Sequence, residues 1–338
     1  MALYTPGEIF DLESGKTLRQ ISISYHTYGK LNAARDNVVW ICHALTANSD
    51  PMEWWSGLLV DHATIDLESN FLICANILGS CYGTTGPLTI DPATGQPYFQ
   101  RFPSITIRDM VKAHQLLANY LNISRINLLI GGSMGGYQAL EWCVMDPAFI
   151  KELFLVTTSA KESAWGIAIH AAQRLAIETD STFGEPSAGA GRNGLITARA
   201  IGMLTYRNYI TYQLMQSDTD DSKMDNYKAA SYIEYQGVKL ANRFNAYSYW
   251  SLTRAMDSHN LARGRGMDLA SVLKTIKQRV LIIGISSDIL CPVQEQLFIA
   301  ENIPDSTFIK IDSRYGHDGF LVEGKLISEA LTKWIKEI

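Results

Sequence analysis

Residues 126–136 read INLLIGGSMGG and decide the fold of this chain. Residues 126–130, four of them apolar, predict a buried strand, residues 137–145 predict a helix, and Gly131-Gly132-Ser133-Met134-Gly135 fits the pattern G-x-S-x-G. So sharp a turn between strand and helix forces its central residue into a strained conformation, and glycine on either side avoids Cβ collisions. The turn also places the Ser133 hydroxyl at a helix N-terminus, which favours developing negative charge. We predict that Ser133 is a nucleophile; a glycine-rich turn with a bystander serine is the alternative.

The segments on both sides of this motif alternate between strands and helices. Residues 17–28 alternate like a half-buried strand, and residues 106–121 predict a helix that begins with a capping box of Thr106 and Asp109. Short apolar runs, typical of strands buried in a parallel sheet, occur at residues 37–43, 70–77, 152–158, 279–285 and 307–311. The alternation predicts an α/β fold with a mostly parallel sheet flanked by helices.

The middle of the chain differs, because it lacks such strand runs. Residues 195–216 and 245–256 show amphipathic helical patterns instead. We predict an α/β core made of residues 1–160 and 274–338, with residues 161–273 inserted as a helical cap; a separate, linker-joined helical domain is the alternative. Residues 189–194 match G-x-G-x-x-G, but no strand precedes them, so we expect a flexible loop rather than a dinucleotide site.

A serine hydroxyl is a weak nucleophile and needs a base, which a third group must orient. In this architecture the chain order is Ser, then Asp or Glu, then His. His170 and His259 lie within helical patterns, whereas His317 lies in a glycine-flanked loop directly after a predicted strand. Open α/β sheets carry their reactive groups in such loops. We therefore predict His317 as the base, with a turn histidine as the alternative.

The acid that orients this base should also follow a core strand. Asp288 comes directly after the predicted strand at 279–285, and 29 residues separate it from His317, enough for one helix and one strand. Asp305 and Asp312 compete, but Asp305 falls between a helix and the next strand, at the wrong edge of the sheet. We predict Asp288 as the acid.

Two N–H groups are needed to stabilise the oxyanion of an acyl-transfer intermediate. One should be the amide of Met134, directly after the nucleophile, and the other should come from a loop after an early strand. The loop that begins at His43 fits this position, and the amide of Leu45 is its best-placed donor. We expect His43 itself to brace this loop.

Composition limits the possible functions. The chain has 338 residues, 47% of them hydrophobic, and its 29 Lys and Arg against 34 Asp and Glu give a net charge of −5. A chain of this composition forms a sizeable core and lacks the basic excess of a general polyanion binder, so we expect no nucleic-acid partner.

The five cysteines are odd in number and none form C-x-x-C pairs, which argues against a disulfide framework and favours a reducing compartment. The first residues, MALYTPGEIF, do not resemble a secretory signal, and no uncharged stretch is apolar enough to span a membrane. We expect a cytoplasmic protein with no membrane partner.

The chain resembles the homoserine O-acetyltransferase family, α/β-hydrolase-fold acyltransferases of methionine biosynthesis, over nearly its whole length. The motifs that carry this resemblance are HALT at 43–46, NILGSCYGTTGP at 76–87, GGSMGG at 131–136, QALEW at 138–142, LTYR at 204–207, GRG at 264–266 and GHDGFL at 316–321.

The resemblance implies the triad of Ser133, Asp288 and His317, and it adds two substrate-binding residues. Arg199 matches an arginine that binds the substrate carboxylate, and Asp318 matches an acid that holds its ammonium group. It further implies acetyl transfer from acetyl-CoA to L-homoserine, with acetyl-CoA as a co-substrate, no bound cofactor or metal, and a homodimer formed through cap helices.

Several alternatives remain open from the sequence. The donor could be succinyl-CoA, the acceptor could be serine, or the protein could be a plain esterase, a thioesterase or a non-catalytic binding protein. The aromatic residues near 244–250 fit either the core of the cap or an exposed patch, and Arg263 and Arg265 fit either a solvated loop or a contact with CoA phosphates.

Overall fold

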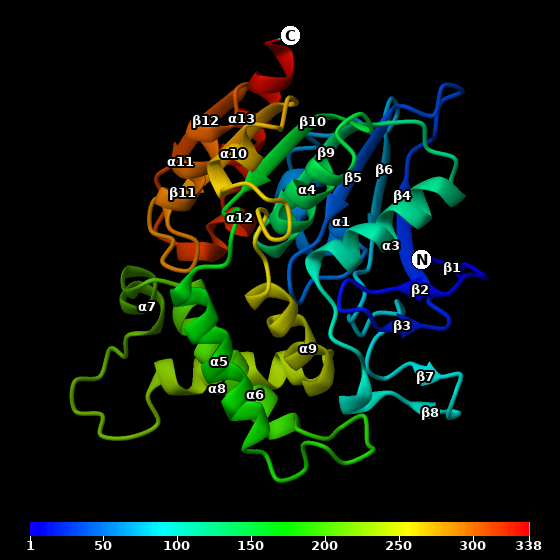
Figure 1. Cartoon of the computed structure of the whole chain (residues 1–338). Coiled ribbons are helices and arrows are strands. Elements are labelled where there is room, and N and C mark those ends of the chain that lie inside the picture. The colour runs from blue at the N-terminus through cyan, green and yellow to red at the C-terminus, as the bar shows by residue number, and fades with distance from the viewer. Residues whose placement is uncertain (338) are drawn as a thin grey trace.

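An eight-stranded, mostly parallel sheet runs through the centre of the computed structural model, which describes residues 1–337 (Figure 1). Its strands are β1 (Ala2–Tyr4), β4 (Ile23–Tyr28), β5 (Val38–Cys42), β6 (Phe71–Ala75), β9 (Ile126–Gly132), β10 (Ile150–Val156), β11 (Arg279–Ile285) and β12 (Ser306–Ile311). They follow the order β1-β4-β6-β5-β9-β10-β11-β12, and only the β1–β4 and β4–β6 pairs are antiparallel. Two small hairpins accompany the sheet, β2 (Phe10–Asp11) with β3 (Thr17–Leu18) and β7 (Ile90–Asp91) with β8 (Gln96–Pro97).

Helices cover both faces of the sheet, which confirms the α/β class. One face is covered by α3 (Ile107–Tyr120), α4 (Met134–Met145), α10 (Leu269–Leu273) and α11 (Val293–Asn302). The other face is covered by α1 (Pro51–Trp54), α2 (Ser56–Leu59), α12 (Gly319–Val322) and α13 (Gly324–Lys336). Successive residues of β5 point to opposite faces, so Trp40 and Ile41 belong to different hydrophobic clusters. Two short 3₁₀ helices complete the core, η1 (Phe99–Arg101) and η2 (Gly316–Asp318).

The predicted helical insertion lies between β10 and β11. It contains α5 (Ala164–Glu178), α6 (Arg192–Tyr206), α7 (Tyr209–Gln216), α8 (Lys228–Ala241) and α9 (Ala246–Asp257). Figure 1 shows these helices together at one end of the sheet, where they form a cap. The division of the chain at residues 160 and 273 stays a prediction, and α10, which falls inside the predicted cap, packs against α11 of the core.

Two predicted elements are broken in the structure. The strand expected at 17–28 is split, because the backbone of Ser22 bonds to Thr85, whose hydroxyl accepts the Ser22 N–H at 2.8 Å. The helix expected at 195–216 ends at Tyr206, because Arg207 is extended (φ −109°, ψ 166°) and Asn208 caps a new helix, α7. The predicted helix at 106–121 is confirmed, and its capping box of Thr106 and Asp109 is present.

The structure shows where the aromatic residues near 244–250 and the G-x-G-x-x-G segment lie. The side chains of Phe244, Tyr247 and Tyr249 are buried, so the aromatic residues belong to the core of the cap rather than to an exposed patch. The G-x-G-x-x-G segment runs into α6, with Gly191 (φ 74°) as its N-terminal cap, so a flexible loop is wrong for its second half. Among residues 1–337, no helix combines the length and apolar character needed to cross a membrane.

Both arginines of the loop at 263–266 are engaged in ion pairs, although Gly264 and Gly266 between and after them are exposed. Arg265 pairs with Glu141 at 2.6 Å, Arg108 pairs with the same carboxylate at 3.1 Å, and only 1% of the Glu141 side chain is exposed. Glu13 in turn binds Arg108 and Arg263. This ion-pair network joins the N-terminal segment, α3, α4 and the chain that returns from the cap.

Candidate active site

Ser133 lies at a sharp turn between β9 and α4, as the motif predicts. Its backbone has φ 54° and ψ −128°, a left-handed conformation that is strained for any residue but glycine. A Cβ on Gly131 would lie 2.4 Å from the carbonyl oxygen of Gly135, and a Cβ on Gly135 would lie 2.0 Å from that of Cys42. The turn therefore closes only with glycine at both positions.

The structure brings Ser133, His317 and Asp288 together from three separate loops. His317 Nε2 lies 2.8 Å from Ser133 Oγ, and His317 Nδ1 lies 2.7 Å from Asp288 Oδ2. Asp288 is held in turn, because its Oδ1 accepts the N–H groups of Leu290 and Cys291. A carboxylate can only accept, so Nδ1 carries the hydrogen and the Nε2 lone pair faces the hydroxyl. This arrangement can remove the proton of Ser133.

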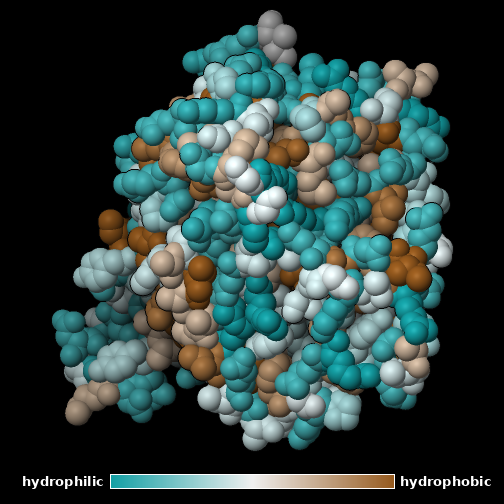
Figure 2. Space-filling model, viewed as in Figure 1, coloured by the Kyte–Doolittle hydropathy of each residue, from teal (hydrophilic) through white to brown (hydrophobic). Residues whose placement is uncertain are grey.

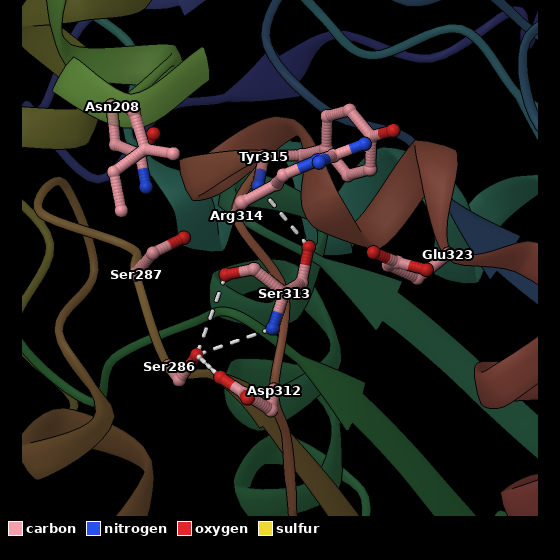
Figure 3. Close-up of a pocket in the computed structure, with 9 residues that line it drawn as sticks. Asn208, Ser286, Ser287, Asp312, Ser313, Arg314, Tyr315 and Glu323 are labelled. Atoms are coloured by element: carbon pink, nitrogen blue, oxygen red, sulfur yellow. Dashed lines mark hydrogen bonds between the residues drawn. The ribbon is translucent and has the colours of Figure 1, made fainter. Parts of the chain in front are cut away.

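The competing acids lie elsewhere. Asp305 precedes β12 and is therefore at the opposite end of the strand from His317. Asp312 follows β12 but bonds Ser286 Oγ at 2.7 Å, as Figure 3 shows. Ser286 also accepts the N–H of Ser313 at 3.2 Å. These bonds, which lie in an open groove of about 580 Å³, join the loop that carries Asp288 to the loop that carries His317.

The two predicted oxyanion donors lie beside the nucleophile. Leu45 and Ser133 line the same pocket, and Met134 begins α4 directly after Ser133. Within residues 1–337, the N–H groups of Leu45 and Met134 bond to no protein acceptor. His43 braces the loop as expected, since its Nε2 accepts the N–H of Ile77 at 3.1 Å. Burial lowers the pKa of His43 to about 4 and keeps the ring neutral.

Opposing forces act on the base. Burial of the His317 ring disfavours its charged form, but the carboxylate of Asp288, with smaller effects of Asp318 and Glu162, outweighs this and raises the pKa of His317 above its usual value. The pKa of Asp318 is also raised, because burial outweighs the nearby charges of Arg207, Arg199 and His317. The active centre is therefore a set of coupled charges rather than an isolated pair.

A narrow pocket of about 100 Å³ opens onto Ser133 and His317. Both residues implied for substrate binding, Arg199 and Asp318, line it. Arg199 lies over the ring of Tyr206, 5.0 Å from its centroid, and its buried Nε has no hydrogen-bond partner among the described residues. The pocket thus presents a cation and a carboxyl group to whatever binds next to the serine.

Sequence reasoning did not assign a role to two residues of this site. Arg207, directly after α6, has Nε 2.8 Å from Asp318 Oδ2, so it fixes the carboxyl group that faces the pocket. His170, on α5, lines the pocket although its helical context pointed to a bystander. Asn208 was the available sequence signal for Arg207. Asparagine often caps a helix N-terminus, and a new helix after Asn208 requires the preceding helix to end near Arg207.

His259, in contrast, behaves as the packed residue that its context predicts. Its ring stacks on Tyr137 at 4.1 Å, and its Nε2 lies 3.2 Å from the carbonyl oxygen of Ser159. Burial lowers its pKa to about 3, so the ring is neutral. Tyr137 donates its own hydroxyl hydrogen to Glu162 at 3.0 Å. The stack therefore joins α4, which carries Tyr137, to the segment that follows α9.

Comparisons with known proteins agree with the fold and add a family. Residues 37–324 match the model of the alpha/beta hydrolase fold. A curated protein of Cyclobacterium marinum named homoserine O-acetyltransferase is 46% identical over 98% of this chain and 93% of its own length. A solved homoserine O-acetyltransferase from Staphylococcus aureus is 26% identical, with a TM-score of 0.82 over 99% of this chain and 94% of its own.

An acetylester hydrolase from Corynebacterium glutamicum shares the same fold. Its structure has a TM-score of 0.85 over 98% of this chain and 95% of its own, at 21% identity. At that identity the likeness concerns the fold alone. The fold is therefore shared by proteins named as an acetyltransferase and as an acetylester hydrolase, and it does not by itself distinguish the two.

Proposed function

The chain belongs to the homoserine O-acetyltransferase family of α/β-hydrolase-fold enzymes, and from this we propose that it transfers the acetyl group of acetyl-CoA to the side-chain hydroxyl of L-homoserine. The observation that carries the proposal is the line of hydrogen bonds from Asp288 through His317 to Ser133, at 2.7 and 2.8 Å, beside a pocket with Arg199 and Asp318. The reaction proceeds by two acyl transfers through Ser133.

In the first step, His317 Nε2 takes the hydroxyl proton of Ser133 while Oγ attacks the thioester carbon of acetyl-CoA. The amides of Leu45 and Met134 donate to the oxyanion that forms. The intermediate collapses, the carbon–sulfur bond breaks, and the thiol of CoA leaves with the proton from His317. An acetyl ester remains on Ser133.

In the second step, L-homoserine binds with its carboxylate on Arg199 and its ammonium group on Asp318. Arginine presents a planar fork to a carboxylate, and a carboxylate offers a counter-charge to an amine. His317 takes the proton of the substrate hydroxyl, whose oxygen attacks the ester carbon. The bond to Ser133 Oγ breaks, and His317 returns the proton to that oxygen.

Water could replace the amino acid in this second step and give hydrolysis. We propose that the cap, residues 161–273, limits this by narrowing the entrance to Ser133. Burial supports this role: Ser133 is 8% exposed and His317 is 4% exposed, and cap residues such as Arg199, Tyr206 and Met256 form one wall of the pocket. The proposed reaction needs acetyl-CoA as a co-substrate but no bound cofactor.

We further propose that the protein forms a homodimer through its cap helices, in the cytoplasm. Tyr209, Ile210, Leu214 and Met215 are exposed on α7, a helix of eight residues. Figure 2 shows apolar side chains in brown at the left edge of the molecule, where Figure 1 places α7. A second copy that covers these side chains would remove their apolar surface from water.

Release of CoA tests the proposed activity most simply. The purified chain is mixed with acetyl-CoA, with and without L-homoserine, and free thiol is followed over time. The proposal expects a single turnover per site without the amino acid and sustained release with it. Thiol release at the same sustained rate in both samples would identify a thioesterase, and release only from succinyl-CoA, or only with L-serine, would change the donor or the acceptor.

A further inference from the structure

A second histidine in the pocket of Ser133 is oriented by its own carboxylate. His170 lies on α5, is 4% exposed, and has Nδ1 2.8 Å from Asp257 Oδ1. The other carboxylate oxygen of Asp257 bonds Arg174 at 2.5 Å. Asp257 is thereby held between the two side chains, and the imidazole has a fixed direction.

The contacts of His170 define what its other nitrogen can do. The carboxylate of Asp257 can only accept, so the hydrogen of the neutral ring is on Nδ1 and Nε2 presents a lone pair. Within residues 1–337, the hydrogen bond of the His170 side chain is made by Nδ1, and the ring lines the pocket together with Ser133, Arg199 and Asp318. An acceptor that opens onto the pocket and has no protein partner is free to take a hydrogen bond from a bound ligand.

The charges of the pocket indicate which part of a ligand fits this acceptor. Arg199 offers donors and a positive charge, which suit a carboxylate, and Asp318 has an oxygen already engaged by Arg207 at 2.8 Å. An ammonium group has three N–H donors that point in different directions, so one carboxyl group on one side of it cannot accept all three. The lone pair on His170 Nε2, in the tautomer with its hydrogen on Nδ1, can accept one of them.

We propose that His170 is a substrate-binding residue whose Nε2 accepts a hydrogen bond from the ammonium group of the acceptor amino acid. Asp257 is then a positioning residue, because it selects the tautomer with a free lone pair on Nε2. Together with Asp318, His170 selects alcohols that carry an amine over alcohols without one. This inference rests on the proposed function, since it specifies how that site reads its acceptor.

Three substrates separate the possible roles of His170. L-Homoserine has both head groups, 4-hydroxybutyrate lacks the ammonium group, and 3-amino-1-propanol lacks the carboxylate. In H170F, kcat/KM should fall by about 10- to 100-fold for the two substrates that carry the amine, as expected for loss of a hydrogen bond to a charged group, and stay unchanged for 4-hydroxybutyrate. The rate of acyl-enzyme formation from acetyl-CoA should also stay unchanged.

Two further variants keep the test independent of folding. In H170Q, the side-chain amide oxygen can lie near the position of Nε2, so selectivity for the amine should return in part. In D257N, the amide can donate to Nδ1 and move the ring hydrogen to Nε2, so the loss of selectivity should resemble that of H170F. Equal losses of kcat/KM for all three substrates would overturn the inference. A loss confined to the two substrates that carry a carboxylate would also overturn it.

Binding without turnover provides a second readout. L-Homoserine is titrated calorimetrically into S133A and into the double variant S133A/H170F. A weaker affinity of the double variant than of S133A supports the role of His170. If the wild-type enzyme transfers acetyl to no amino acid, the proposed function fails. If it does so and H170F keeps its selectivity, only the present inference fails.

Discussion

Ser133 Oγ and His317 Nε2 lie 2.8 Å apart although 184 residues separate them in the chain. The turn after β9 presents the hydroxyl, and the loop after β12 presents the imidazole, at the same edge of the parallel sheet. Asp288 comes from the end of β11, the strand that pairs with β12 in parallel register. The topology therefore places three groups from distant segments within hydrogen-bond reach, and the cap covers them.

The raised pKa of His317 predicts the pH dependence of acylation. The base must be neutral to accept a proton, so the rate rises with pH as the imidazolium loses its proton. Because the neighbouring carboxylates raise this pKa, the midpoint of the acid limb should lie above pH 6.5, the ordinary value for histidine. The measurement is the rate of acyl-enzyme formation from p-nitrophenyl acetate across pH, without an acceptor.

In D318N this midpoint should move to lower pH. Asp318 contributes to the raised pKa of His317, and removing its charge makes the imidazolium less stable. The matched control is D305N, which lies before β12 and away from the triad. An unchanged midpoint in D318N, or an equal shift in D305N, would contradict the coupling.

Arg207 should act on the amino acid and not on the acyl donor. In R207Q, the carboxyl group of Asp318 loses its partner at 2.8 Å, and its pKa rises further because Arg207 opposes the effect of burial. We expect KM for L-homoserine to increase by roughly tenfold, because the part-buried ion pair that fixes this carboxyl group is lost, with an unchanged acylation rate. Steady-state kinetics with both substrates varied measure this, with R101Q on η1 as the control. A slower acylation step would show that Arg207 supports the triad instead.

The buried carboxylate of Glu141 predicts a large effect on stability. It is 1% exposed and binds both Arg108 and Arg265, so E141Q removes the counter-charge of Arg265 and leaves Arg108 with Glu13 alone. We expect the free energy of unfolding to fall by about 3–5 kcal/mol, measured by urea denaturation. The comparison is E329Q, whose pair with Lys325 is exposed and 3.9 Å long. That variant should change stability by less than about 1 kcal/mol, and similar losses in both would refute the role of burial.

The proposed dimer predicts a change in mass when the exposed face of α7 is charged. Sedimentation of the wild type should give twice 37.6 kDa, and L214D should sediment as a single chain because its carboxylate cannot be buried against apolar residues. The control is L326D on α13, outside the cap, where Leu326 is 41% exposed against 59% for Leu214. A wild type that sediments only at 37.6 kDa rejects the dimer.

The sequence predicted the sheet well because its signals are local. The apolar run at 279–285 coincides with β11, and the capping box of Thr106 and Asp109 marks the start of α3. The split at Arg207 was missed because residues 195–216 keep a helical pattern through the break. The break places Arg207 beside Asp318, which lies far along the chain, so a local pattern could not predict the contact.

Long-range pairs explain most of what the sequence could not predict about the site. Glu141 and Arg265 form a buried pair across 124 residues, and His170 and Asp257 across 87. Periodicity and motifs describe neighbours along the chain, so they gave no sign that either pair exists. His170 could only be recognised as part of the pocket once α5 and α9 were placed side by side.

The acyl-enzyme on Ser133 tests the central claim most directly. The wild type and S133A are each exposed to acetyl-CoA, quenched in acid, and digested for mass spectrometry. We predict one acetyl group on the wild-type peptide that contains Ser133, no acetyl group on the same peptide of S133A, and loss of the modification when L-homoserine is added before quenching. An acetyl group on another residue, or full transferase activity in S133A, would contradict the account.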